Sequence, residues 1–199
     1  MEVKKIVSFD FDGTLTTKDT LFEFIKFSRG KFRLYFCLLL FSPLLLAFKL
    51  KLYPNWKIKQ TIFRYLYKNI SLDQFNKWGD SFIVNINQII RPKAIQKLKE
   101  YQSEDAIILI VSASIENWIK PWANSEGINV ILATTIEVNC DRILTGNFKS
   151  ENCYREQKVK RILEVFPDRS SYTLIAYGDS LGDKEMIDFA DEGWYNKFK

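Results

Sequence analysis

Histidine is absent from this chain of 199 residues. Its absence excludes serine–histidine nucleophilic triads, histidine general bases and histidine-containing metal sites. The chain has three cysteines, and the wide spacing of Cys37, Cys140 and Cys153 fits neither a zinc site nor a disulfide framework. Any catalysis must therefore use carboxylates, lysines, hydroxyls or thiols, and the cysteines indicate a reducing compartment.

Two further absences narrow the class of protein. The N-terminal segment has no signal-peptide pattern, which predicts a cytoplasmic location. The most apolar stretch, Leu34–Phe48, is shorter than the roughly 20 residues of a transmembrane helix and contains Pro43. With 47% hydrophobic and 27% charged residues, the chain is expected to fold as one domain, or as a core with an insertion. The net charge of +5 suits nucleic acid, anionic lipid or a phosphorylated substrate equally.

Short apolar runs alternate with amphipathic helical patterns along the chain. The helical patterns are Pro92–Lys99, which begins with proline, and Gln157–Phe166. The alternation predicts an α/β fold with a buried parallel sheet, whose chemistry gathers at the carboxyl ends of the strands. The predicted strands are Ile6–Phe9, Ile107–Val111, Val130–Leu132 and Thr173–Tyr177.

A β-hairpin is predicted from Ile136–Val138 and Ile143–Thr145, which flank a polar turn. Two interpretations stay open for it. It is either a simple connection or a flap beside the site.

Acidic side chains follow the first and last predicted strands. Asp10 and Asp12 are two residues apart, so an extended strand would direct both carboxylates to one face, and Gly13 allows a sharp turn after them. Asp179 and Asp183 follow the last strand and are expected to meet the first pair across the sheet edge. Such a cluster suits Mg²⁺, which prefers oxygen ligands. The alternative is an acidic turn and a helix-capping loop.

Candidates for binding a phosphate come from two other segments. Ser112 ends a predicted strand, and its hydroxyl and the backbone N–H groups that follow, starting at Ala113, are suited to a phosphate oxygen. Lys158 begins a predicted helix and is expected to reach the same anion. Position alone does not separate it from Lys149 and Lys160.

These segments resemble the four motifs of the haloacid dehalogenase superfamily of phosphatases. Asp10–Thr16 matches the first motif, Ser112 the second, Lys158 the third and Gly178–Asp183 the fourth. The motifs occur in order over nearly the whole chain. The resemblance implies a Rossmann-like core formed by residues 1–16 and 91–199. Residues 17–90 resemble the helical C1-type cap of the phosphoserine-phosphatase-like subfamily IB.

The resemblance also implies a mechanism. Asp10 would attack phosphorus to form an aspartyl-phosphate, and Asp12 would protonate the leaving oxygen and then activate water. Mg²⁺ would be held by Asp10, the backbone carbonyl of Asp12 and Asp179, with support from Asp183. The implied phosphate-binding residues are Ser112, Ala113 and Lys158. Phosphoserine itself is not favoured, since Gly13, Ser112–Ser114 and Asp19 depart from the pattern of true phosphoserine phosphatases.

The stretch Leu34–Phe48 raises the question of a membrane. Lys31 and Arg33 precede it, and Lys49 and Lys51 follow it, which suits a helical hairpin dipping into one anionic leaflet. The alternatives are the interior of the cap and a dimer interface. The candidate membrane residues are Phe36, Leu39, Leu40 and Leu45.

Three functions follow from these patterns. The first is a phosphatase acting at the inner face of the cytoplasmic membrane on a lipid phosphate, because the cap resembles that of phosphatidylglycerophosphate phosphatases. The second is a cytosolic phosphatase for small metabolites. The third is a non-catalytic membrane or nucleic-acid adaptor, although the chain carries no nucleic-acid-binding motif. The oligomeric state is left open.

Overall fold

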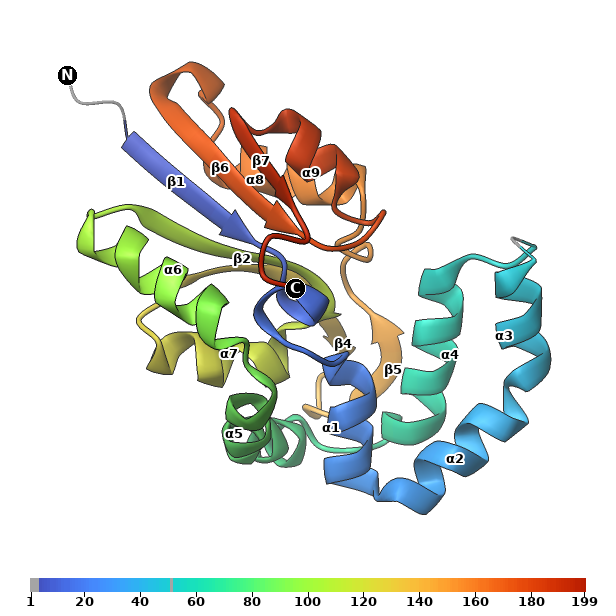
Figure 1. The fold of residues 1–199 in the computed structure, drawn as a ribbon. Helices are drawn as coiled ribbons and strands as arrows, with labels where there is room; N and C mark the ends of the chain where they lie inside the picture. Colours follow the sequence, from blue (N-terminus) through green and yellow to red (C-terminus); the bar gives the residue numbers. More distant parts are fainter. Residues whose placement is uncertain (1–3, 51) are drawn as a thin grey trace.

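A five-stranded parallel sheet with the order β3–β2–β1–β6–β7 forms the centre of the computed structural model, which describes residues 4–50 and 52–199 (Figure 1). Each strand predicted from the sequence is present, and the parallel α/β fold is confirmed. The strands are β1 Lys4–Phe9, β2 Ile107–Ile115, β3 Val130–Thr134, β6 Tyr172–Gly178 and β7 Glu192–Tyr195.

Helices cover both faces of the sheet. The helices α6 (Pro92–Ser103) and α7 (Glu116–Ser125) lie on one face, and α8 (Glu156–Val165) and α9 (Lys184–Phe189) lie on the other (Figure 1). The alternation of side chains along β1 serves both layers, because Val7 and Phe9 pack with the first pair of helices and Ile6 with the second. Burial of both faces explains why the strands are continuous apolar runs.

In the described part of the chain, five α-helices lie between β1 and α6, on the side of the sheet where β1 and β6 end (Figure 1). The chain leaves the sheet and returns to it at one place, since Thr17 N donates to Ile89 O at 2.7 Å and Arg91 N donates to Leu15 O at 2.8 Å. An aromatic cluster around Phe24 joins this helical segment to the core. The helices are α1 Thr20–Arg29, α2 Lys31–Leu40, α3 Ser42–Lys49, α4 Asn55–Tyr67 and α5 Leu72–Ile89.

The predicted β-hairpin is present, with a shifted second strand. The strand β4 (Ile136–Val138) pairs antiparallel with β5 (Leu144–Phe148), so β5 starts one residue later than predicted and extends three residues further. Ile143 instead bridges to Ser71 at the start of α5. The hairpin also bonds to α4, because Phe148 N donates to Gln60 Oε1 at 3.0 Å. It therefore links the core to the helical segment.

Strand β7 was not predicted. It pairs in parallel with β6 at the edge of the sheet, and all four of its residues are exposed. An edge strand with exposed side chains lacks the apolar run by which the inner strands are predicted.

The packing of α5 against α7 predicts the effect of a substitution at Gly79. A Cβ at this buried helical position would lie 2.3 Å from the backbone oxygen of Asn117. Alanine normally favours a helix over glycine by about 1 kcal/mol. We expect Gly79→Ala instead to destabilise the protein by about 1–3 kcal/mol, because the two helices must move apart. Urea unfolding measures this, with Ser81→Ala on the exposed face of α5 as the control. A stabilised Gly79→Ala protein would contradict the packing.

Candidate active site

Asp10 and Asp12 follow the end of β1 as predicted, but they lie in a turn and not in the extended backbone that would direct both carboxylates to one face. The strand ends at Phe9, and the turn Phe11–Leu15 is closed by a 3.0 Å hydrogen bond from Thr16 N to Phe11 O. Phe11 is buried against Trp122. Because the backbone turns here, the carboxylates of Asp10 and Asp12 diverge to different partners, although both line one cavity.

Asp10 forms a buried ion pair with Lys158. The ammonium Nζ of Lys158 lies 2.5 Å from Asp10 Oδ1, 2.5 Å from Asp183 Oδ1 and 2.7 Å from Val111 O. Its side chain is 2% exposed, so these contacts replace hydration. Lys158 reaches the carboxylates from the first turn of α8. Lys149 and Lys160, its competitors in the sequence, are exposed.

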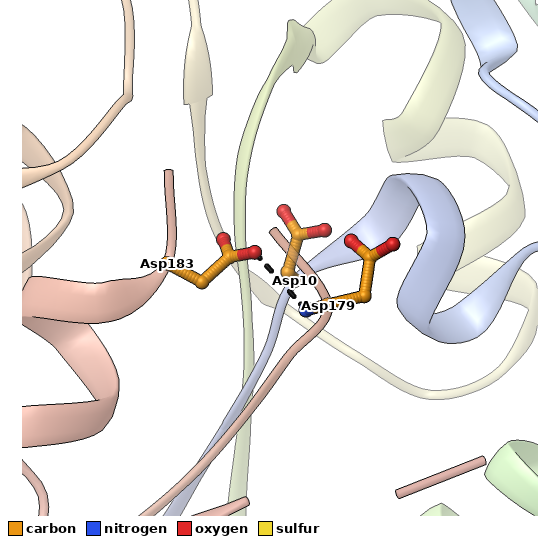
Figure 2. Close-up of side chains that lie close together, drawn as sticks. All are labelled: Asp10, Asp179 and Asp183. Carbon is orange, nitrogen blue, oxygen red and sulfur yellow. Dashed lines mark hydrogen bonds between the residues drawn. The ribbon is translucent and has the colours of Figure 1, made fainter. Parts of the chain in front are cut away.

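Asp179 and Asp183 complete a group of three acids with Asp10. One carboxylate oxygen from each lies within 4.8 Å of the others, and Figure 2 shows both residues of the β6–α9 loop beside Asp10. Backbone N–H groups fix this loop, because Asp179 N and Ser180 N donate to Asp183 Oδ2 at 3.1 and 2.9 Å. Asp183 thus supports the loop and the cluster together.

The composition of this cluster fits a divalent cation. Three carboxylates face the buried ammonium of Lys158 and the more exposed ammonium of Lys199, so the ionised carboxylates outnumber the cations in a mostly buried place. Carboxylate oxygens are the ligands that Mg²⁺ prefers. Asp179 attracts a cation in this structure, since Lys199 Nζ lies 3.1 Å from its Oδ2.

Gly13 leaves the space that Asp179 occupies. A Cβ at Gly13 would lie 2.2 Å from Asp179 Oδ2, and its φ of +83° is one that residues with a Cβ rarely adopt. The glycine of the first motif is therefore needed both for the turn and for the approach of the second acidic loop.

The pKa values of the cluster reflect burial first and charge second. Burial raises the pKa of Asp10 to about 8, opposed by Lys158 and assisted by Asp183. Burial also lowers the pKa of Lys158, but the carboxylates of Asp10 and Asp183 outweigh it, so the net direction is upward. The pKa of Asp183 is lowered, because Lys158 and the Ser180 donors outweigh its burial.

Asp12 has a separate set of partners. Thr20 N donates to its Oδ1 at 2.7 Å, and the Ser114 hydroxyl donates to its Oδ2. Thr20 Oγ1 and Ser114 Oγ are 3.1 Å apart, and Trp118 Nε1 donates to Thr20 Oγ1 at 3.2 Å. Burial and the Asp19 carboxylate raise the pKa of Asp12 to about 6, although the bonds from Ser114 and Thr20 favour the ionised form.

Thr20 was not predicted as a site residue from the sequence, and Ser114 was named there only as part of the departure from the phosphoserine-phosphatase pattern. Their common signal is a hydroxyl near the carboxyl end of a strand or at the start of a helix. That signal is too frequent to single them out.

Ser112 and Ala113 lie inside β2, and not at its end as expected. The pairing of β2 with β3 is irregular between Val111 and Ile115, and this frees the intervening backbone from a regular ladder. Ser112 Oγ accepts from Ser114 N at 3.1 Å. Ser112 and Ala113 line the same cavity as Asp10 and Lys158.

The cavity measures about 540 Å³ and lies between the sheet and the helical segment. Its polar floor consists of the acidic residues and Lys158, together with Ser112 and Ser180. Its opposite wall is largely apolar. That wall is formed by Leu21, Phe22, Leu45, Phe48, Ile58 and Ile62, with Lys18 and Lys59 beside them.

Comparison with protein-family models identifies the family of the chain. The family model of the haloacid dehalogenase-like hydrolases matches residues 7–188. The chain belongs to this family. The match spans all the site residues described above, from Asp10 to Asp183.

Individual proteins resemble this chain in sequence or in fold. Protein CicA from Caulobacter vibrioides is 32% identical over 195 residues, covering 98% of this chain and 86% of CicA. A protein from Bordetella pertussis Tohama I has the same fold, with a TM-score of 0.81, 16% identity and coverage of 98% and 89% of the two chains. A phospho-aspartyl intermediate analogue of phosphoserine phosphatase matches with a TM-score of 0.67, 20% identity and coverage of 98% and 86%.

The raised pKa of Asp10 predicts how the metal-free protein responds to pH. In the metal-free protein the pKa of this carboxyl is about 8, against 3.8 for an ordinary aspartate, so proton binding competes with the ion pair to Lys158 below that value. The folded state then binds more protons between these values, so stability is lost as the pH rises through them. Asp12 acts in the same direction up to about pH 6, and Asp183 titrates below its ordinary value, outside this window. The chain has no histidine to obscure the trend.

We expect the unfolding temperature in EDTA to fall by roughly 5 °C or more from about pH 5 to about pH 8. Added Mg²⁺ should stabilise the protein most at the higher pH, where it competes with fewer protons. Differential scanning fluorimetry measures both, with Asp10→Asn as the control that flattens the pH dependence. An equal slope in the wild type and in Asp10→Asn would refute the assignment.

Proposed function

We propose that this chain is a Mg²⁺-dependent phosphomonoester hydrolase in which Asp10 is the nucleophile. The proposal rests on one observation, which is that the two aspartates of the first motif contact different partners. Asp10 lies with Lys158 and the acidic cluster, whereas Asp12 bonds to Ser114 and Thr20 on the side of the helical segment. One group is placed to attack and the other to move a proton.

The binding of the phosphoryl group is assigned to residues around Asp10. Lys158, the Ser112 hydroxyl and the backbone N–H of Ala113 would neutralise its oxygens. Mg²⁺ would be held by Asp10, the backbone carbonyl of Asp12 and Asp179, with Asp183 supporting the loop. When bound, the ion supplies positive charge for the phosphate oxygens. Phosphoryl transfer depends mainly on such positioning and neutralisation.

The reaction has two steps. In the first, an Asp10 oxygen forms a bond to phosphorus as the bond from phosphorus to the leaving oxygen breaks, and Asp12 gives that oxygen its proton. In the second, Asp12 takes a proton from water, the water oxygen bonds to phosphorus, and the Asp10–phosphorus link breaks. Inorganic phosphate leaves and both aspartates return to their starting states. The pKa of Asp12 near 6 suits a group that must give and then take a proton.

The helical segment is proposed as a C1-type cap that comprises residues 17–90, on a core of residues 1–16 and 91–199. The chain leaves the core and returns to it at one place, where backbone hydrogen bonds join Thr17 to Ile89 and Arg91 to Leu15. One such connection between two parts is a natural hinge, which supports this division. The subfamily IB resemblance is part of the same proposal.

The proposed substrate is a lipid phosphate, of which phosphatidylglycerophosphate is the candidate suggested by the cap. The apolar wall of the cavity supports it, because Leu45, Phe48 and Ile62 suit an acyl chain better than a charged leaving group. The substrate is expected at the inner face of the cytoplasmic membrane. A small soluble metabolite is the alternative, and kcat/KM for a lipid phosphate in detergent micelles against a soluble ester separates the two.

Substitutions of the two aspartates should give different kinetic results. We expect Asp10→Asn to lower the turnover of p-nitrophenyl phosphate in Mg²⁺ by at least about a thousandfold, because no covalent intermediate forms. Asp12→Asn should still release about one equivalent of p-nitrophenolate in a rapid burst, since this leaving group needs no proton. Its later turnover should be slower by about 10²–10⁴-fold. Stopped-flow absorbance measures the burst.

Asp80→Asn, at an exposed position on α5, is the matched control and should behave as the wild type. Turnover should cease in EDTA and return with Mg²⁺. An active Asp10→Asn protein, or an Asp12→Asn protein without a burst but with residual turnover, would refute the division of roles.

A further inference from the structure

The helix α2, together with Leu46 of α3, exposes six large apolar side chains. Phe32 is 93% exposed and Leu39 72% exposed, and their spacing along α2 places them on one side of the helix. Large exposed patches of this kind are uncommon on monomeric proteins and usually mark an interaction site. We call this surface the α2–α3 apolar face, and it consists of Phe32, Tyr35, Phe36, Leu39, Leu40 and Leu46.

This face is not required for the interior of the protein. The opposite side of α2 already packs inward through Leu34 and Cys37, which are 3% and 1% exposed. In Figure 1 the two helices lie at the outer edge of the helical segment, with α4 on their inner side. Leu45, expected with the membrane residues, is half-buried and lines the cavity instead. Some residues of Leu34–Phe48 therefore pack inside the protein, and others are exposed on its surface.

In the sequence around the α2–α3 apolar face, all charged residues are basic. No aspartate or glutamate occurs in the sequence between Glu23 and Asp73. Lys31 and Arg33 are exposed at the start of α2, and Lys49 is exposed at the end of α3. The segment between those two acids contains ten basic residues, Lys26, Arg29, Lys31, Arg33, Lys49, Lys51, Lys57, Lys59, Arg64 and Lys68.

The geometry suits a bilayer surface more than a bilayer span. Within the described residues, no single helix is long and apolar enough to cross a membrane. The pair α2 and α3 reaches the required length and hydropathy together, but it bends by 62° at the junction. Helices with apolar and basic faces lie in the interfacial plane, where aromatic residues such as Tyr35 are also favoured.

We propose that the α2–α3 apolar face docks on the surface of an anionic lipid bilayer. Apolar side chains would enter the acyl boundary, while Lys31, Arg33 and Lys49 contact the headgroups. A second copy of the chain fits less well, because a two-fold contact through this face would bring the same basic residues together.

Docking would also place the cavity next to the lipid. Helix α3 contributes Leu46 to the exposed face, and Leu45 and Phe48 to the wall of the cavity that holds Asp10 and Asp12. The delivery of a lipid phosphate by this route rests on the proposed function, whereas the docking does not.

Vesicle flotation tests the docking directly. We expect the wild type to float with vesicles of phosphatidylglycerol and phosphatidylcholine in equal parts, and much less with phosphatidylcholine alone. The double variant Phe36→Asp/Leu39→Asp should lose at least about tenfold in partitioning. Lys31→Gln/Arg33→Gln should lose about fivefold for each charge removed. None of the four substituted residues lines the cavity, so both double variants should hydrolyse p-nitrophenyl phosphate as the wild type does.

Matched controls come from exposed residues elsewhere on the protein. Val84→Asp/Val165→Asp and Lys93→Gln/Lys160→Gln should float as the wild type does. Failure of the wild type to float, or full flotation of Phe36→Asp/Leu39→Asp, would overturn the proposal. A dimer in size-exclusion chromatography that these two substitutions dissociate would overturn it as well, in favour of a second copy.

Activity on lipid phosphates separates this proposal from the enzymatic one. Phe36→Asp/Leu39→Asp should hydrolyse a lipid phosphate normally in detergent micelles and at least about tenfold more slowly in anionic vesicles. Flotation without hydrolysis of any phosphomonoester by the wild type would refute the proposed function and leave the docking supported. Hydrolysis of p-nitrophenyl phosphate without flotation would refute the docking and leave the proposed function supported.

Discussion

The structure depends on how negative charge is held at the carboxyl ends of its central strands. Asp10 and Asp183 contact the same buried ammonium of Lys158, and Asp179 adds a third carboxylate within 4.8 Å. Uncompensated charge of this kind is costly in a protein interior. The order of the sheet makes the arrangement feasible, because β1 lies beside β6 and brings their terminal acids together, while Lys158 approaches from α8. Gly13 completes it by leaving room for Asp179.

The turn that follows β1 links the acidic cluster to the helical segment. Asp12 receives a hydrogen bond from Thr20 N at the start of α1, so the turn after β1 is tied to the first helix of the segment. The floor of the cavity is polar and belongs mostly to the sheet, and its wall is apolar and comes mostly from helices. Under the proposed function, this division would assign the reaction to one part of the chain and the selection of the substrate to the other.

The sequence predicts those parts of the protein that have local patterns. Buried strands such as Ile107–Val111 appear as apolar runs, and the acids after them follow from the rule for parallel sheets. Strand β7 has no such pattern, because its residues are exposed at the sheet edge. Thr20 and Ser114 are 94 residues apart, so their convergence on Asp12 depends on the tertiary fold. The stretch Leu34–Phe48 is apolar all round, and folding decides that Leu45 faces the cavity while Leu39 faces outward.

The central claim is that Asp10 carries the phosphoryl group during turnover. Borohydride reduces an aspartyl-phosphate to homoserine, so quenching the enzyme with borohydride during hydrolysis marks the residue that was phosphorylated. Peptide mass spectrometry then locates the mark. The account predicts homoserine at position 10, dependent on substrate and on Mg²⁺. Reduction at position 12, or turnover without a mark at position 10, would contradict it.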